Sequence, residues 1–146
     1  MNSKEFKNVF DEVAKRNGFK KAFGGWFRES PECIIVLALQ KSNYGDYYEL
    51  LIKIYIQGLF EKIYFINKDL VNKEVGHIRS GASKEKREIF DFDNPMDEVL
   101  RKERLEKLFS EFIVPFTERA LSKSGIRNLA ERGEIFLLPA VKEELA

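Results

Sequence analysis

Cysteine is almost absent from this chain, since Cys33 is the only one among its 146 residues. One thiol allows neither an internal disulfide nor a zinc site built from several cysteines. Long apolar stretches are also absent: the longest uninterrupted run, Cys33 to Leu39, is far shorter than the roughly 20 residues that span a bilayer. Because the N-terminus is charged from Lys4 onward and has no signal-peptide pattern, we expect a cytoplasmic protein without a membrane anchor.

An excess of either charge is missing as well. The chain has 25 basic and 24 acidic side chains, which gives a net charge of +1. Such a balance creates no general attraction to nucleic acid or to an anionic membrane. The sequence contains no G-x-S-x-G, G-x-x-x-x-G-K-[ST], G-x-G-x-x-G or H-E-x-x-H motif. We therefore expect no cofactor and no metal, and a noncatalytic role is favoured over an enzymatic one.

What the chain does contain is enough apolar material for a core. Apolar residues make up 44% of the sequence and aromatic residues 13%. A chain of about 150 residues can bury roughly 70% of its unfolded surface. No linker, internal repeat or low-complexity tract divides the sequence. We therefore predict a single domain over residues 1–146.

The first residues have the pattern of an amphipathic helix. Asn2 and Glu5 have the spacing of a capping box, with Asn in place of the usual Ser or Thr. Apolar residues then recur every three or four positions, at Phe6, Val9, Phe10, Val13 and Ala14. Gly18 can adopt the left-handed conformation that often ends a helix.

The next part of the chain predicts β-strands. Two aromatic-rich segments joined by Gly24-Gly25 indicate a hairpin, because glycine tolerates the positive φ of a tight turn. Ile34–Leu39 is apolar on both faces, as in a central strand, and Tyr47–Gln57 alternates between apolar and polar residues, as in a half-buried one. Beyond Phe60 the pattern weakens. There we expect short strands at Ile63–Ile66, Val75–Arg79 and Ile89–Phe92, with a mobile loop at Ser80–Lys86.

The last third predicts helices. Asn94-Pro95 suits a helix start, and pairs such as Asp97 and Arg101 have the i,i+4 spacing of ion pairs on a solvent-exposed face. Pro115 lacks a backbone donor, so a kink or break is expected there. Two short helices follow, around Gly133 and Pro139. The order of elements favours an α+β fold, an antiparallel sheet of about five strands packed against an N-terminal helix and a C-terminal helical region.

Several of these segments, taken together, resemble a known bacterial family. They are the helix Ser3–Phe10 with Gly18–Lys21, the stretch Gln40–Gly45, the strand Tyr47–Tyr55, Gly76–Arg79, Phe92-Asp93 and the helix that contains Pro115. In their order and spacing they resemble domain of unknown function 4304. The resemblance implies a small single-domain bacterial protein. It supplies no activity, ligand or site residue.

One candidate site centres on His77, the only histidine and the only side chain that titrates near neutral pH without perturbation. Arg79 shares its face of a predicted strand, and Asp91 and Asp93 share a face of another. If the two strands were neighbours, these residues could form the acid–base or anion-binding cluster of a small hydrolase-like enzyme. The alternative is a polar sheet face with surface ion pairs.

A second candidate is a surface of tyrosines at Tyr44, Tyr47 and Tyr48, near the predicted turn between two strands. Tyrosine combines a rigid apolar ring with a polar tip, which suits recognition surfaces, although ordinary packing along a strand also explains it. Cys33 could be a nucleophile if it were paired with His77, but a thiol in an apolar run normally packs as a small apolar group.

A third candidate is the basic N-terminal segment. Residues 1–28 contain seven basic side chains against three acidic ones, and Trp26 and Phe27 could stack on single-stranded bases. A solvated helix face explains the same charges. Among the three, the sequence favours a noncatalytic module that binds a protein partner, with the enzyme and the nucleic-acid binder as alternatives. It leaves the oligomeric state open.

Overall fold

The computed structural model describes residues 1–146. Helix α1, Ser3–Arg16, begins as predicted: the Asn2 side chain accepts a hydrogen bond from the Glu5 amide, and the Glu5 side chain accepts one from the Asn2 amide. Phe6 and Phe10 on its inner face are completely buried. Gly18, with φ of 88°, turns the chain after the helix.

The predicted antiparallel sheet is present, with five strands in the order β1-β2-β3-β4-β5. The strands are β1 Lys20–Ala22, β2 Gly25–Glu29, β3 Cys33–Lys41, β4 Tyr48–Ile56 and β5 Ile78–Gly81. The β1–β2 turn has positive φ at Phe23 and Gly24, whereas Gly25 already belongs to β2. Gly25 is needed for another reason, because a Cβ there would lie 2.8 Å from the Val71 side chain.

The segments on either side of β5 differ from the prediction. Ile63–Ile66 forms no strand and lies between the 3₁₀-turn η1, Leu59–Glu61, and the short helix α2, Lys68–Asn72. Ile89–Phe92 is not a strand either. Its first two residues end a 3₁₀-helix, η2, Lys84–Phe90, and Asp91 makes a single bridge with Tyr47. Extended backbone becomes a strand only beside a partner strand, and the sequence does not specify one here.

The predicted C-terminal helices are present with altered boundaries. They are α3 Glu98–Leu108, the π-helical turn η3 Phe109–Ile113, α4 Val114–Ala120, α5 Lys123–Glu131 and α6 Pro139–Leu145. Asp97 caps α3 by accepting a hydrogen bond from the Val99 amide, so the predicted start at Asn94-Pro95 is wrong. The chain does not break at Pro115. It widens into the π-helical turn just before the proline, which accommodates the missing donor.

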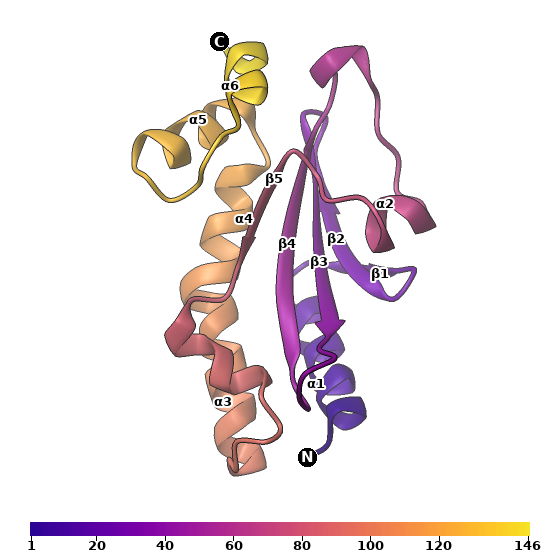
Figure 1. Ribbon diagram of the computed structural model, residues 1–146, viewed down its shortest axis with the longest axis vertical. Coiled ribbons are helices and arrows are strands. Elements are labelled where there is room, and N and C mark those ends of the chain that lie inside the picture. The colour runs from indigo at the N-terminus through magenta and orange to yellow at the C-terminus, as the bar shows by residue number, and fades with distance from the viewer.

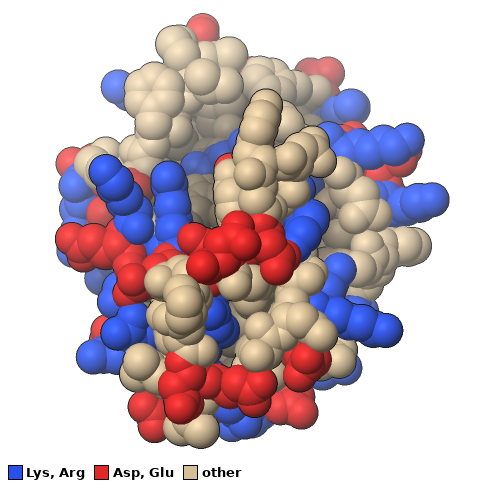
Figure 2. All heavy atoms as spheres, turned by 60° about the horizontal axis from the view of Figure 1, so that its bottom comes forward, with Lys and Arg blue, Asp and Glu red and all other residues tan.

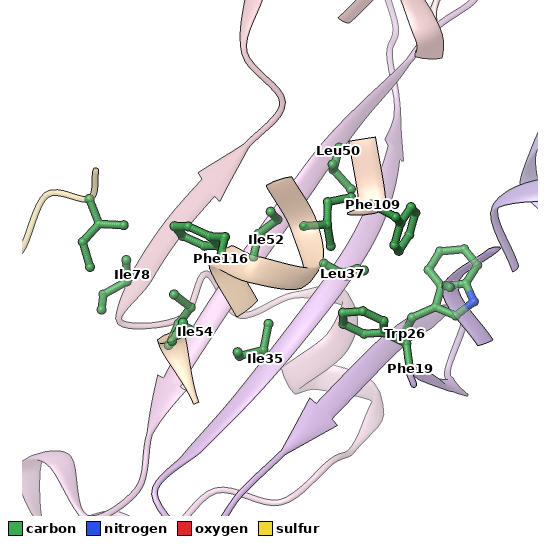
Figure 3. Close-up of a cluster of buried hydrophobic side chains, with 14 of the residues drawn as sticks. Phe19, Trp26, Ile35, Leu37, Leu50, Ile52, Ile54, Ile78, Phe109 and Phe116 are labelled. Atoms are coloured by element: carbon green, nitrogen blue, oxygen red, sulfur yellow. The ribbon is translucent and has the colours of Figure 1, made fainter. Parts of the chain in front are cut away.

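The sheet is covered on both faces, unequally. Helices α1, α3 and α4 lie on one side of it and α2 on the other, and the two termini are at opposite ends of the long axis (Figure 1). The first face contributes to a cluster of 28 buried apolar residues, in which Ile35, Ile52 and their neighbours point toward Phe109 and Phe116 (Figure 3). The second face has a cluster of only five. None of the helices combines the length and apolar character needed to cross a bilayer.

Candidate functional site

The β3–β4 connection is tied down by contacts at both ends. The Ser42 amide donates to the Tyr47 carbonyl at 3.0 Å, and the Ser42 hydroxyl accepts from the Tyr44 amide at 3.0 Å. The Asp46 amide donates to Asp93 Oδ2 at 2.9 Å, and Lys41 forms an ion pair with the Asp46 carboxylate. These contacts leave the Tyr44 ring projecting from the surface with 95% of its area exposed.

The three candidate tyrosines differ in what they can contact. Tyr44 is free in solvent, and Tyr47 is partly exposed and lines a groove. Tyr48 faces the main core instead, where its ring packs edge-on against Phe92 with centroids 5.8 Å apart. Its hydroxyl donates to the Ser3 carbonyl at 3.3 Å. Tyr48 also lines the groove, but its contacts fasten β4 to α1, whereas Tyr44 and Tyr47 are not anchored in the main core.

The groove exists because the pairing of β4 with the following chain is interrupted. The β4–β5 ladder ends at Leu51 and Gly81, and pairing resumes only at the single bridge between Tyr47 and Asp91. The chain between them leaves the sheet as η2, which opens a groove of about 760 Å³ beside β4. We call this the β4 groove. The side chains with polar groups in its lining are Tyr47, Tyr48, Glu49, Ser80, Lys84, Arg87, Glu88, Asp91 and Asn94.

One buried arginine shapes the far wall of the β4 groove. Arg101 of α3 is 2% exposed. Its guanidinium donates to four backbone carbonyls, those of Glu88, Ile89, Asp91 and Asn94, at distances between 2.7 and 3.2 Å. Only Nε has no partner. Burial lowers the pKa of Arg101, but a guanidinium stays charged in any case, so it remains a fixed cation beneath these carbonyls.

The β4 groove carries charges of both signs. Glu88 is paired with Arg104, whereas Lys84, Arg87 and Glu49 form no salt bridge within the chain. Figure 2 shows the end of the molecule where α1 begins and the β3–β4 connection lies, with acidic and basic side chains interspersed and no broad area of one sign. Such a surface suits hydrogen bonds and ion pairs with a polar partner more than a continuous phosphate backbone.

His77 lies at the other end of β4. Its amide donates to the Ile54 carbonyl, and its Nδ1 accepts from the Ile56 amide at 2.9 Å. Asp91 is opposite Tyr47. Tyr47 lies eight residues before Tyr55, whose ring packs against His77. At the rise of a β-strand, Asp91 and His77 are therefore separated by roughly 25 Å.

The predicted cluster of His77, Arg79, Asp91 and Asp93 is therefore not formed. Arg79 is exposed on β5 opposite Lys53. Asp91 and Asp93 support the tyrosine connection instead, since Asp91 Oδ1 accepts from the Asp93 amide at 3.0 Å. Sequence alone could not show this, because the pairing of the two segments depends on where η2 leaves the sheet.

Cys33 and Trp26 are also unavailable for the suggested chemistry, whereas Phe27 is partly exposed. Cys33 is completely buried in the main core, which raises its pKa to about 12, while His77 packs against Tyr55 on the opposite face of the sheet. Trp26 is completely buried and its Nε1 donates to Asp11 at 2.8 Å. A buried indole cannot stack on a base, so the predicted stacking on Trp26 is wrong.

Sequence reasoning missed the residues that build the β4 groove. Lys84 and Arg87 lie in or beside the stretch expected to be a mobile loop, and Arg101 was expected on the solvent side of its helix. No motif marks them, since their grouping comes from tertiary contacts. No three side chains of His, Cys, Asp or Glu lie close enough together to hold a metal ion.

Comparison with known protein families gives a match. The sequence pattern of a family described as "Domain of unknown function (DUF4304)" matches residues 10–119, which include α1 from Phe10 onward, the whole sheet and α3, and end within α4. This confirms the resemblance seen in the sequence. No curated protein and no solved structure matches the chain.

Proposed function

The chain belongs to the DUF4304 family, and from that premise we propose that it is a noncatalytic protein-binding module whose binding surface is the Tyr44–Tyr47 connection together with the β4 groove. The observation that carries the proposal is the exposure of Tyr44, 95%, on a connection that is otherwise firmly hydrogen-bonded. A large ring held in solvent by an ordered backbone loses little conformational entropy on binding.

The groove beside Tyr47 adds the polar half of such a surface. Lys84, Arg87 and Glu49 lie along it without partners in the chain, so each can pair with a charge on a bound protein. Interfaces commonly combine an aromatic anchor with a polar, partly charged rim. The lining contains neither histidine nor cysteine, which supports binding over nucleophilic catalysis.

The proposal is tested by affinity capture from native lysate of the source organism, with quantitative comparison of the retained proteins. We expect Tyr44→Ala/Tyr47→Ala to reduce retention of the specific partner by about tenfold or more, as loss of aromatic anchors does at interfaces. Phe65→Ala/Phe136→Ala is the matched control, because these rings are 72% and 76% exposed on other parts of the surface.

A charge reversal separates the groove from the connection. Lys84→Glu/Arg87→Glu leaves Tyr44 untouched and is expected to weaken the same partner, with a smaller difference at high salt. If both tyrosines can be removed without changing which proteins are retained, or if the Phe65/Phe136 control loses the same proteins, the binding surface is not the one proposed.

A further inference from the structure

The chain between β4 and β5 forms a strap, residues 58–77, over the second face of the sheet. Its inward residues Leu70 and Val71 complete the five-residue cluster with Ile34, Val36 and Tyr55. The main core on the other face has 28 buried residues, so the strap has much less apolar contact to hold it in place. Its attachment therefore depends to a larger degree on polar contacts.

Most of those polar contacts do not change near neutral pH. The Tyr55 hydroxyl donates to the Leu70 carbonyl at 2.7 Å, and Lys53 Nζ donates to the Val71 and Glu74 carbonyls at 2.6 and 2.9 Å. The Gln57 side chain exchanges two hydrogen bonds with the backbone of Tyr64, at 2.7 and 2.8 Å. Acid does not remove the hydrogen from any of these donors, so none of these bonds is itself the pH-sensitive one.

The contact made by His77 is different. Because Nδ1 accepts from the Ile56 amide at 2.9 Å, it carries no proton, and the neutral ring must carry its proton on Nε2. Nε2 lies 2.9 Å from the Tyr64 hydroxyl, which therefore accepts from it. The neutral imidazole thus connects the edge of β4 to the strap through both nitrogens. A doubly protonated ring would place a second donor against the Ile56 N–H.

We propose that the strap is a pH-sensitive latch: neutral His77 ties Tyr64 to the edge of β4, and protonation of Nδ1 breaks the bond to Ile56 and detaches the strap from the second face of the sheet. This goes beyond the proposed function and does not depend on it, because the β4 groove lies at the other end of β4.

The groups around His77 favour its neutral form. Burial is the larger cause and the Lys62 ammonium the second, and together they lower the pKa of His77. The other groups that line the same shallow hollow or face it from neighbouring elements are Tyr55 and Lys53 of β4, Tyr64, Lys73 and Glu74 of the strap, and Arg79 of β5. Glu74 is the only anion in this set, against three cations, and Lys62 is a fourth.

Detachment of the strap would expose the second face of the sheet to solvent. Tyr55, Ile34 and Val36 would become accessible, beside Ile63 and Phe65, which already face solvent with 62% and 72% of their area exposed. The acidified protein would therefore display an apolar sheet face that the neutral protein covers.

Nuclear magnetic resonance tests the latch directly, because His77 is the only histidine and its imidazole signals are unambiguous. At pH 7.5 we expect the tautomer protonated on Nε2. As the pH falls through the pKa of His77, exchange protection of the Ile56, Tyr64 and Val71 amides, corrected for intrinsic rates, should drop about tenfold or more. The Leu37 amide in the middle of the sheet should keep its protection.

Two variants separate the latch from general acid destabilisation. His77→Asn places a carbonyl oxygen near the position of Nδ1, so it can accept from Ile56 but cannot titrate, and strap protection should become independent of pH in this range. Tyr64→Phe keeps the Ile56 bond and should loosen residues 62–66 at every pH. A neutral-pH tautomer with the proton on Nδ1, unchanged strap protection in acid, or a pH response that persists in His77→Asn would each overturn the latch. If His77→Asn does not fold, the wild-type titration decides alone.

Discussion

At the scale of single residues, Arg101 matters because its guanidinium is buried and surrounded by backbone carbonyls. A guanidinium offers five donors in a fixed plane, and here the two terminal nitrogens donate to four carbonyls of the chain between Glu88 and Asn94. The Phe92 ring lies 5.1 Å from its central carbon. Arg101 thus acts as an interior brace for the segment that walls the β4 groove.

Replacing Arg101 should lower the free energy of unfolding substantially. For Arg101→Met we expect a loss of unfolding free energy on the order of 3 kcal/mol, because several buried carbonyls would lose their donor. Urea unfolding measures it. Arg104→Met, on the same helix but in an exposed pair with Glu88, is the matched control and should cost about 0–1 kcal/mol. Equal losses in the two variants would mean that Arg101 is not a structural support.

The sequence could not reveal this role. The i,i+4 spacing of Asp97 and Arg101 predicted an ion pair on the solvent side, but spacing alone does not say which face of a helix meets the core. Asp97 turns out to cap α3 and Arg101 to point inward. The spacing of α1 was more informative, because an uninterrupted stripe that includes Phe6, Phe10 and Val13 can only be buried.

At the scale of elements, signals between adjacent residues predicted the local structure correctly, but the sequence did not show which segments pair with one another. The capping box of α1, the hairpin turn and the irregularity before Pro115 depend on adjacent residues, and all three are present. The strap shows the opposite case. Ile63 and Phe65 face out while Tyr64 and Ile66 face in, which is strand-like alternation in a segment that pairs with no strand.

The strap also predicts a pH dependence of stability. The pKa of His77 is lowered in the folded protein, whereas an unfolded histidine titrates near pH 6.5. Its stabilising contribution is therefore fully present above about pH 6.5, and it is lost as the pH falls from there through the folded pKa. Urea unfolding between pH 7.5 and 5 should show a larger decrease for wild type than for His77→Asn.

The comparison with His77→Asn matters because carboxylates also begin to titrate at the acid end of this range. They are the same in both proteins, so their effect cancels in the difference between the two profiles. Parallel profiles would show that His77 does not couple protonation to folding, whatever happens to the strap locally.

At the scale of the whole molecule, the buried cluster joins parts of the chain that the family pattern does not include. The match covers residues 10–119, yet the main core extends from Phe6 to Leu145. Phe6 packs edge-on against Phe90 and Phe92, with centroids 5.4 and 5.2 Å apart. Residues near both ends of the chain therefore contribute to the same buried cluster, which gives a way to test the prediction of one domain over residues 1–146.

A fragment limited to residues 10–119 should not fold cooperatively. It lacks Phe6 and the buried residues of α5 and α6, which are Ile126, Leu129, Val141 and Leu145. Losing one such side chain costs about 2–5 kcal/mol, whereas a whole domain is stable by only about 5–15 kcal/mol. Thermal unfolding followed by near-ultraviolet circular dichroism compares the fragment with the full chain, and a chain lacking only residues 139–146 should be intermediate. A sharp transition of the fragment near that of the full chain would show that residues 10–119 fold without the terminal segments, and the expectation that one cooperative core needs them would then be wrong.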